Sequence, residues 1–348
     1  MSFDPNGVGI ANGNVFGFPV EEHEADIIII PVPWDVTASY GKGTSRGPQA
    51  ILDASVQLDF YHPLLENAFE TKVYMTPISN EWIEINDQLC VKSAEYINFL
   101  ESGSDIKHGV SFKETLEEIN TTQLGLRNNL KERALDLINK GKIIALLGGE
   151  HSTPLGLIEA LNEIKKPFGI LQIDAHADLR IAYEGFEQSH ASIMYNVIQS
   201  CNYLTKLVQV GIRDIAQSEV DIIESNDKIK TFYDWDIKNK MFNGKTWNDI
   251  VDDIISHLPD SVYISFDIDG LSPELCPNTG TPVAGGFKLE EINYLIFKIV
   301  SAGKEIIGFD LNEVAPGEND WDANVGARAL WNLVCAAEKS RRIKVIGN

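Results

Sequence analysis

Residues 171–180 read LQIDAHADLR, and this stretch places Asp174, His176 and Asp178 at alternate positions directly after an apolar run. Alternate residues of an extended chain point to the same side, so these side chains would converge at the carboxyl end of a strand. A buried strand is not stabilised by three polar groups on one side unless they bind something positive. A metal ion is one such group; the alternative is that the acids cap neighbouring helices or bind an arginine.

The rest of the chain repeats this pattern of apolar, β-rich runs, most of them followed by a segment with helical periodicity. The runs cover residues 25–33, 72–78, 142–148, 167–174, 206–211, 228–234, 261–269 and 305–311. Helical periodicity is clear at 114–140, 192–201 and 289–303. Continuous apolar strands that alternate with amphipathic helices indicate a parallel sheet covered on both faces. With right-handed crossovers, this predicts a three-layer α/β/α sandwich.

The domain organisation follows from the same pattern. No internal repeat or low-complexity linker interrupts it, so residues 25–348 are expected to form a single domain. Residues 1–24, rich in Gly, Asn and Pro, predict an irregular N-terminal arm. The polar stretch at 101–113 predicts an exposed loop or an insertion within the domain.

Composition limits the classes of partner. Asp and Glu number 51 against 29 for Lys and Arg, a formal charge of -22, which disfavours nucleic acid and anionic membrane surfaces. Cationic small molecules fit this charge, as does a simple need for solubility. The four widely spaced cysteines lack zinc-site spacing and predict reduced thiols in a cytoplasmic protein. We find no signal-peptide pattern and no apolar run long enough to span a membrane.

Three other predicted strands also end in polar residues. His151 follows the paired glycines of GGEHS, Asp267 and Asp269 alternate in SFDIDG, and Glu313 follows the strand at 305–311. Ligands of open α/β sheets bind at the carboxyl ends of strands, so these residues and the first three should share one crevice. The candidate metal ligands are His151, Asp174, His176, Asp178, Asp267 and Asp269.

This set of candidate ligands offers four carboxylates and two imidazoles. So much buried negative charge requires compensation, and it matches the formal charge of two divalent cations. Oxygen and imidazole ligands without thiolate favour Mn²⁺, with Ni²⁺ or Co²⁺ as alternatives. Two such ions can share a water and lower its pKa, so that hydroxide is available near neutral pH.

The motifs GGEHS (148–152), DAHAD (174–178), SFDIDGLSP (265–273), TGTPVAGG (279–286) and EVAPG (313–317), in this order, resemble the ureohydrolase family of arginases and agmatinases. The resemblance spans about residues 25–340. It implies a three-layer α/β/α fold around a mainly parallel, eight-stranded sheet, a single catalytic domain at 25–348, two manganese ions and a homotrimer or homohexamer. It also implies an enzyme that hydrolyses a guanidino compound to urea and an amine.

The resemblance assigns roles to individual metal ligands. His151 and Asp178 match ligands of one metal, and His176 and Asp269 match ligands of the other. Asp174 and Asp267 match the carboxylates that bridge the two metals.

Other residues match the catalytic and substrate-binding positions of the family. His190, in QSHASIM, matches the catalytic loop histidine, which would relay protons together with Asp178; the alternative is an exposed histidine at a helix start. Glu313 matches the acid that holds the guanidinium, and Thr281 lies where the family has a hydroxyl near the substrate.

The substrate's tail is less defined by the sequence. Arginases have an Asn where this chain has Arg180, two residues after Asp178, and the local pattern DLRxxYxG…SHA looks more like agmatinases. We therefore expect agmatine, hydrolysed to putrescine and urea, with Glu184 or Glu187 meeting the distal ammonium. Arginine, guanidinobutyrate and formimidoylglutamate are the alternative tailed substrates.

Free guanidine is a further alternative, because Trp34, Thr37, Tyr40 and Trp321 are expected near the rim and could narrow the pocket. The two tryptophans could equally belong to the core or to a subunit contact. Two other classes remain open: an inactive relative that binds metal, and a two-metal phosphatase. A phosphatase would need cations near the strand ends, where this chain offers mainly acids.

Overall fold

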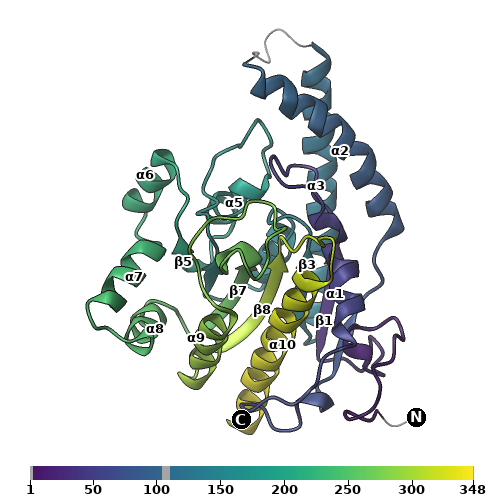
Figure 1. Ribbon diagram of the computed structural model, residues 1–348, viewed down its shortest axis with the longest axis vertical. Helices are drawn as coiled ribbons and strands as arrows, with labels where there is room; N and C mark the ends of the chain where they lie inside the picture. The colour runs from purple at the N-terminus through teal and green to yellow at the C-terminus, as the bar shows by residue number, and fades with distance from the viewer. Residues whose placement is uncertain (1–2, 104–109, 348) are drawn as a thin grey trace.

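The computed structural model describes residues 3–103 and 110–347. Within them the chain forms one eight-stranded, fully parallel sheet of order β2-β1-β3-β8-β7-β4-β5-β6 (Figure 1). The strands are β1 Ile27–Val32, β2 Val73–Met75, β3 Ile143–Gly148, β4 Phe168–Ile173, β5 Leu204–Ile212, β6 Ile229–Tyr233, β7 Ser261–Asp267 and β8 Glu305–Asn312. Each of these strands overlaps one of the predicted apolar runs, so the predicted fold class is confirmed.

Helices cover both faces of the sheet. They are α1 Gly47–Ser55, α2 Asn80–Glu101, α3 Val110–Asn139, α4 Leu155–Glu163, α5 Ile193–Ser200, α6 Gln217–Ser225, α7 Asp234–Phe242, α8 Trp247–Ser256, α9 Leu289–Ser301 and α10 Trp321–Gly347. Figure 1 shows α9 and α10 in front of the sheet, with α2 and α3 rising together beyond its upper edge.

Two hydrophobic cores separate the three layers. Along β1, Ile27 and Ile29 belong to one core and Ile28 and Ile30 to the other, as the alternation of a strand requires. The first core is completed by side chains of α1, α8, α9 and α10, and the second by side chains of α2 to α5. Every strand residue of β1 is buried, which explains its unbroken apolar sequence.

The region around the predicted loop at 101–113 corrects one expectation. Helix α2 extends to Glu101 and α3 begins at Val110, whereas residues 104–109 lie outside the described part of the chain. The loop alternative is therefore wrong for residue 101 and for residues 110–113, which are helical. The physical reason is tertiary: the ring of Phe112 stacks on Phe99 of α2, with centroids 4.6 Å apart, so this end of α3 packs against its neighbour.

The N-terminal segment has little regular structure beyond a short 3₁₀ turn at Val15–Gly17. It is nevertheless packed on the body of the protein, because Phe16 and Phe18 are buried against Trp331 of α10, with centroids 5.0 and 5.9 Å apart. Within the described residues, none of the helices is long and apolar enough to cross a membrane.

Candidate active site

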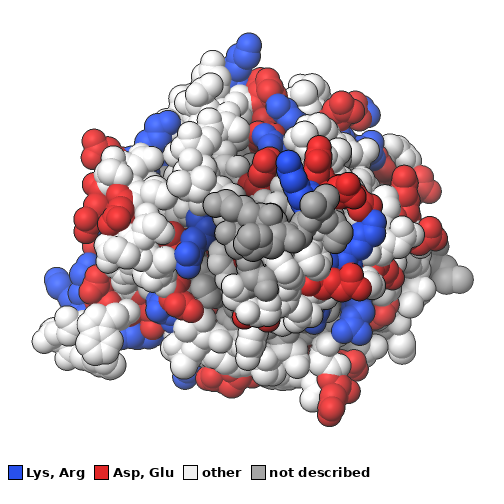
Figure 2. Space-filling view, turned by 90° about the horizontal axis from the view of Figure 1, so that it is seen from above, with Lys and Arg blue, Asp and Glu red and all other residues white. Residues whose placement is uncertain are grey.

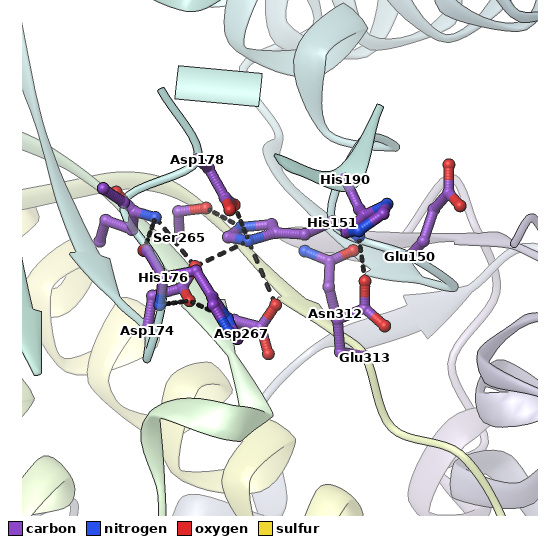
Figure 3. Close-up of polar contacts among 12 residues, drawn as sticks. Glu150, His151, Asp174, His176, Asp178, His190, Ser265, Asp267, Asn312 and Glu313 are labelled. Atoms are coloured by element: carbon purple, nitrogen blue, oxygen red, sulfur yellow. Dashed lines mark hydrogen bonds and ion pairs between the residues drawn. The ribbon is translucent and has the colours of Figure 1, made fainter. Parts of the chain in front are cut away.

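The strand order places the predicted strand ends side by side. Strands β3, β8, β7 and β4 are consecutive in the sheet, so the residues that follow them meet at one carboxyl edge. Figure 3 shows the side chains that these strand ends supply, with His151 at the centre of several contacts. Sequence-distant segments thus converge on a single site, as the strand-end rule predicts.

The first half of the site surrounds His151. Its Nδ1 lies 3.0 Å from Asp174 Oδ2, 2.9 Å from Asp178 Oδ2 and 3.3 Å from Asp267 Oδ2, and all four side chains are buried. On the other side of the ring, His151 Nε2 lies 2.8 Å from the hydroxyl of Ser265. This hydrogen bond fixes the ring so that Nδ1 faces the carboxylates.

The second half surrounds His176. Its Nδ1 lies 3.0 Å from Asp269 Oδ2 and 3.6 Å from Asp174 Oδ1. Two groups of donor atoms close enough to hold a metal ion result, and Asp174 is common to both. One is formed by His151, Asp174 and Asp267, and the other by Asp174, His176 and Asp269. The structure therefore gathers all six predicted ligands, with Asp174 between the two groups.

The donor atoms fit divalent cations. Among the described residues, His151 Nδ1 and Asp178 Oδ2 are buried without a hydrogen bond, although they lie 2.9 Å apart. Burial, and then the charge of Asp174, raises the pKa of Asp178 to about 8. Burial, and then the charges of Asp269 and Asp174, raises the pKa of Asp267 well above its usual range. A bound cation would relieve this mutual repulsion, which is what a site of oxygen and imidazole donors provides.

A buried polar ladder that was not predicted from the sequence holds Asp174. The amide of Gln172 donates to Asp174 Oδ2 at 2.8 Å, Gln209 donates to Gln172 at 2.7 Å, and Thr231 donates to Gln209 at 2.7 Å. The ladder crosses β4, β5 and β6. The sequence held a signal for it, because Gln172 and Gln209 interrupt the apolar runs at 167–174 and 206–211, and the structure buries both side chains fully.

Glu313 follows β8 and lies in a cavity over the cluster. Its side chain is buried, and burial, followed by the charge of Glu150, raises the pKa of its carboxyl well above the usual range. The backbone of Glu313 has φ 64°, in the left-handed region that a side chain other than glycine rarely adopts. A strained residue retained beside an acidic cluster is typical of a functional site.

The cavity has a volume of about 230 Å³. Five of the predicted catalytic and substrate-binding residues line it: Asp178, Arg180, His190, Thr281 and Glu313. The hydroxyl of Thr281 lies 3.4 Å from Asp269 Oδ2. Burial, and then the charge of His176, lowers the pKa of His190 to about 4, so its imidazole is neutral at neutral pH.

Other predicted residues are placed elsewhere. Thr37 is fully buried behind His190, with its hydroxyl directed at Glu150 and His190. Trp34 is fully buried in the core against Trp82, and the indole of Trp321 donates to a backbone carbonyl at the surface. Among the described residues, those that line the cavity include none of Trp34, Thr37, Tyr40, Glu184, Glu187 and Trp321.

Arg180 is already paired. Its Nε lies 3.1 Å from Glu219 Oε2, and its guanidinium lies over the ring of Tyr183. Asp214, which was not singled out in the sequence, lines the same cavity. In the part of the chain that the structure describes, its carboxylate has no hydrogen-bond or ion-pair partner. The rim therefore carries Arg180, whose charge Glu219 already neutralises, and Asp214, whose carboxylate is free to bind a cation.

The fold and the site together define a three-layer α/β/α protein with an acidic, histidine-containing centre whose two groups of donor atoms suit divalent metals. The family model described as the arginase family matches residues 25–336, and the chain belongs to that family. This confirms the resemblance drawn from the sequence motifs.

The chain is similar to curated relatives and, in its fold, to a solved structure. The N(1)-aminopropylagmatine ureohydrolase of Thermococcus kodakarensis is 33% identical over 93% of this chain and 96% of that protein. The agmatinase of Bacillus subtilis is 27% identical over 90% of this chain and 92% of that protein. The agmatine ureohydrolase structure of Thermoplasma volcanium has a TM-score of 0.70 at 21% identity, covering 93% of this chain and 94% of that one.

Proposed function

We propose that this arginase-family hydrolase converts agmatine to putrescine and urea with two divalent cations, Mn²⁺ first and Ni²⁺ or Co²⁺ as alternatives. One observation carries the proposal. Beside the acidic cluster, the buried Glu313 Oε2 faces no hydrogen-bond partner among the described residues, and Glu313 lines the cavity. A planar guanidinium cation supplies the paired N–H donors that such a carboxylate requires.

Different residues of the chain would orient the substrate and transfer the proton. When bound, the two cations supply positive charge and lower the pKa of a water. Glu313 Oε2 accepts hydrogen bonds from the guanidinium and orients it, which removes much of the entropic cost of attack. The departing nitrogen leaves well only as a neutral amine, so it requires a proton. His190 and Asp178 both line the cavity, and they would pass that proton.

The charges at the rim of the cavity favour a substrate with a cationic tail and disfavour one whose tail carries a carboxylate. Glu219 already neutralises Arg180, so this arginine offers little to the α-carboxylate of arginine. The free carboxylate of Asp214 attracts an ammonium instead. Free guanidine was an alternative because Trp34 and Trp321 could have narrowed the pocket. Neither lines the cavity, so this argument for guanidine no longer applies. A phosphate substrate is disfavoured too, because the one arginine that lines the described cavity is paired.

N(1)-aminopropylagmatine is the second candidate substrate. Four of the relatives carry the name of an enzyme for that compound, including the Thermococcus kodakarensis protein. It shares the guanidinium with agmatine and carries a longer cationic tail, so Asp214 would favour both over arginine.

The test is the release of urea, or of formamide from formimidoylglutamate, at equal Mn²⁺, repeated with Ni²⁺ and Co²⁺. The substrates are agmatine, N(1)-aminopropylagmatine, arginine, guanidinobutyrate, formimidoylglutamate and guanidine. We expect kcat/KM to be highest for agmatine and to vanish after chelation of the metal. A higher value for arginine would overturn the tail argument, hydrolysis of guanidine alone would overturn both tailed candidates, and no hydrolysis would indicate an inactive relative.

We also propose a homotrimer or homohexamer in the cytoplasm. The family resemblance supports the oligomer, and the four free cysteines support a reducing compartment. Figure 2 shows acidic and basic side chains interspersed over one face, which fits a small-molecule substrate better than nucleic acid. Light scattering of the purified protein and cell fractionation check the two proposals.

A further inference from the structure

Behind His190 lies a buried pair, Thr37 and Glu150, that the proposed reaction does not use. Both side chains are fully buried. Glu150 Oε2 accepts the main-chain N–H of Thr37 at 2.9 Å, and Glu150 Oε1 accepts the hydroxyl of Thr37 at 2.7 Å. The pair joins the loop after β1 to the GGEHS motif after β3. Figure 3 shows Glu150 and His190 at the same end of the site.

The hydrogen bonds around Glu150 have a fixed direction. The amide nitrogen of Gln123 can only donate, and it donates to the hydroxyl of Ser152 at 2.8 Å. Ser152 in turn donates to Glu150 Oε1 at 2.7 Å. When Glu150 is ionised it carries no proton, so it accepts from Ser152 and from both donors of Thr37, and the single hydroxyl proton of Thr37 is committed to it.

With its proton committed, the hydroxyl oxygen of Thr37 can only accept from His190. It accepts the main-chain N–H of His190 at 3.2 Å, and it lies 3.4 Å from His190 Nδ1. An accepting oxygen at this position favours a proton on Nδ1 and disfavours a lone pair there. The other ring nitrogen, Nε2, contacts no hydrogen-bond partner in the described chain, and His190 lines the cavity.

We propose that Thr37 and Glu150 are positioning residues that hold His190 as the Nδ1–H tautomer and leave the lone pair of Nε2 free at the cavity. The inference rests on the proposed role of His190 as a proton relay. Neither Thr37 nor Glu150 lines the cavity as described. They act through His190 by fixing which nitrogen exchanges protons during the reaction.

The substitution Glu150→Gln reverses the chain of hydrogen bonds with little change in shape. The main-chain N–H of Thr37 needs an acceptor, so the new amide oxygen takes the place of Oε2 and the amide NH₂ faces the hydroxyl of Thr37. That hydroxyl then accepts from the amide and donates towards His190 Nδ1. The favoured tautomer of His190 should change to Nε2–H.

Nitrogen NMR of histidine-labelled, full-length protein loaded with diamagnetic Zn²⁺ measures the tautomer. The chain has seven histidines, so the signals of His190 are assigned as those that disappear in the His190→Ala variant. We expect Nδ1–H in the native protein and in Thr37→Ser, loss of that preference in Thr37→Val, and Nε2–H in Glu150→Gln. Nε2–H in the native protein, or an unchanged tautomer in Thr37→Val and Glu150→Gln, would overturn the proposal.

Kinetics supply the second readout. Thr37→Val and Glu150→Gln should lower kcat about 10- to 10²-fold, part of the usual contribution of general acid–base catalysis, while KM and metal content stay near native values. Thr37→Ser should retain more of kcat than Thr37→Val. Thr44→Val is the matched control, because Thr44 is fully buried in the same loop and its hydroxyl has no partner among the described residues.

The outcomes separate this inference from the proposed function. A native kcat in Thr37→Val alongside a defective His190→Ala would overturn the positioning role. If the native protein hydrolysed no guanidino compound, the proposed function would fail, while NMR would still decide the tautomer. Glu150 is adjacent to His151, so Glu150→Gln could lose metal. In that case the positioning role is decided by comparing kcat and the tautomer of His190 between Thr37→Ser and Thr37→Val.

Discussion

Glu313 uses its two carboxylate oxygens differently with respect to His151. Oε1 accepts the main-chain N–H of His151 at 2.8 Å, which ties the end of β8 to the end of β3. Oε2 is buried without a partner in the described structure. A Cβ on Gly280 would lie 2.8 Å from Oε2, so glycine at this position leaves the oxygen room. One oxygen thus holds the residue in place and the other is left for a ligand.

Glu313→Gln should lower kcat/KM for agmatine by about 10- to 10²-fold, the usual value of a hydrogen bond to a charged group. The amide keeps the shape and an acceptor for His151 but loses the charge that pairs with the guanidinium. Metal content should remain native. The measurement is steady-state urea release together with elemental analysis, and an unchanged kcat/KM would show that Glu313 does not hold the substrate.

Asp174→Asn should reduce the bound metal below two ions per chain and abolish nearly all activity, because Asp174 belongs to both groups of donor atoms. Asp267→Asn should act in the same direction through the group that contains His151. Elemental analysis of the purified variants tests this, with Asp214→Asn as a control that keeps its metal. A metal-free yet active protein would contradict a metal-dependent reaction.

His190→Ala should lower kcat by roughly 10²- to 10⁴-fold, the usual contribution of general acid–base catalysis, without loss of metal. His190 lines the cavity but lies in neither group of candidate metal ligands. The check is kcat measured across the pH range alongside metal content. Normal turnover at every pH would exclude a role in proton transfer.

Asp214→Asn should raise KM for agmatine about 2- to 5-fold, since a partly exposed charge pair contributes little. The reason is the loss of the free carboxylate that meets the distal ammonium. Tailless guanidine, if it is hydrolysed at all, should be unaffected. Glu187→Gln is the matched control, because Glu187 is exposed and does not line the cavity as described. Equal effects of the two substitutions would show only a general change in surface charge.

Asp35→Asn should lower the free energy of unfolding by about 1–3 kcal/mol at pH 7. Asp35 Oδ2 accepts the N–H groups of Gly43 and Ser45 at 2.8 and 3.2 Å and so holds the loop that carries Thr37. Burial raises the pKa of Asp35, but hydrogen bonds from Gly43, Cys90 and Ser45 outweigh it and leave the pKa below its usual value of 3.8.

The pH dependence of this effect has a definite sign. A carboxyl whose pKa is lower in the folded state stabilises the protein above its unfolded pKa, and this contribution is lost as pH falls through the folded pKa. The difference between native protein and Asp35→Asn should therefore shrink below about pH 4. Urea unfolding of both proteins at pH 7 and below pH 4 measures it. A difference independent of pH would mean that the charge of Asp35 contributes nothing.

The sequence by itself determined the strands and indicated which candidate ligands gather at one edge of the sheet. The apolar runs predicted all eight strands because a strand buried on both faces must be apolar throughout. Asp174 and Asp178, like Asp267 and Asp269, were predicted to point together by alternation along a strand, and this reason was wrong. Strand β4 ends at Ile173, Asp178 has φ 54°, and Asp269 lies in the 3₁₀ helix Ile268–Gly270, so the turns after the strands bring these side chains to the site. The convergence of different strand ends followed from a general rule for parallel sheets, and the motifs were specific enough to indicate the family.

Only the tertiary structure decided which groups neutralise one another. Glu219 pairs with Arg180 across the cavity rim, and Thr37 meets Glu150 and His190 from positions 113 and 153 residues away in the chain. It also placed Trp34 in the core and left Asp214 free at the rim. Local sequence patterns could not give these results, because hydrogen bonding and burial depend on which strands become neighbours in the sheet. That order, β3-β8-β7-β4, brings together segments that are far apart in the sequence.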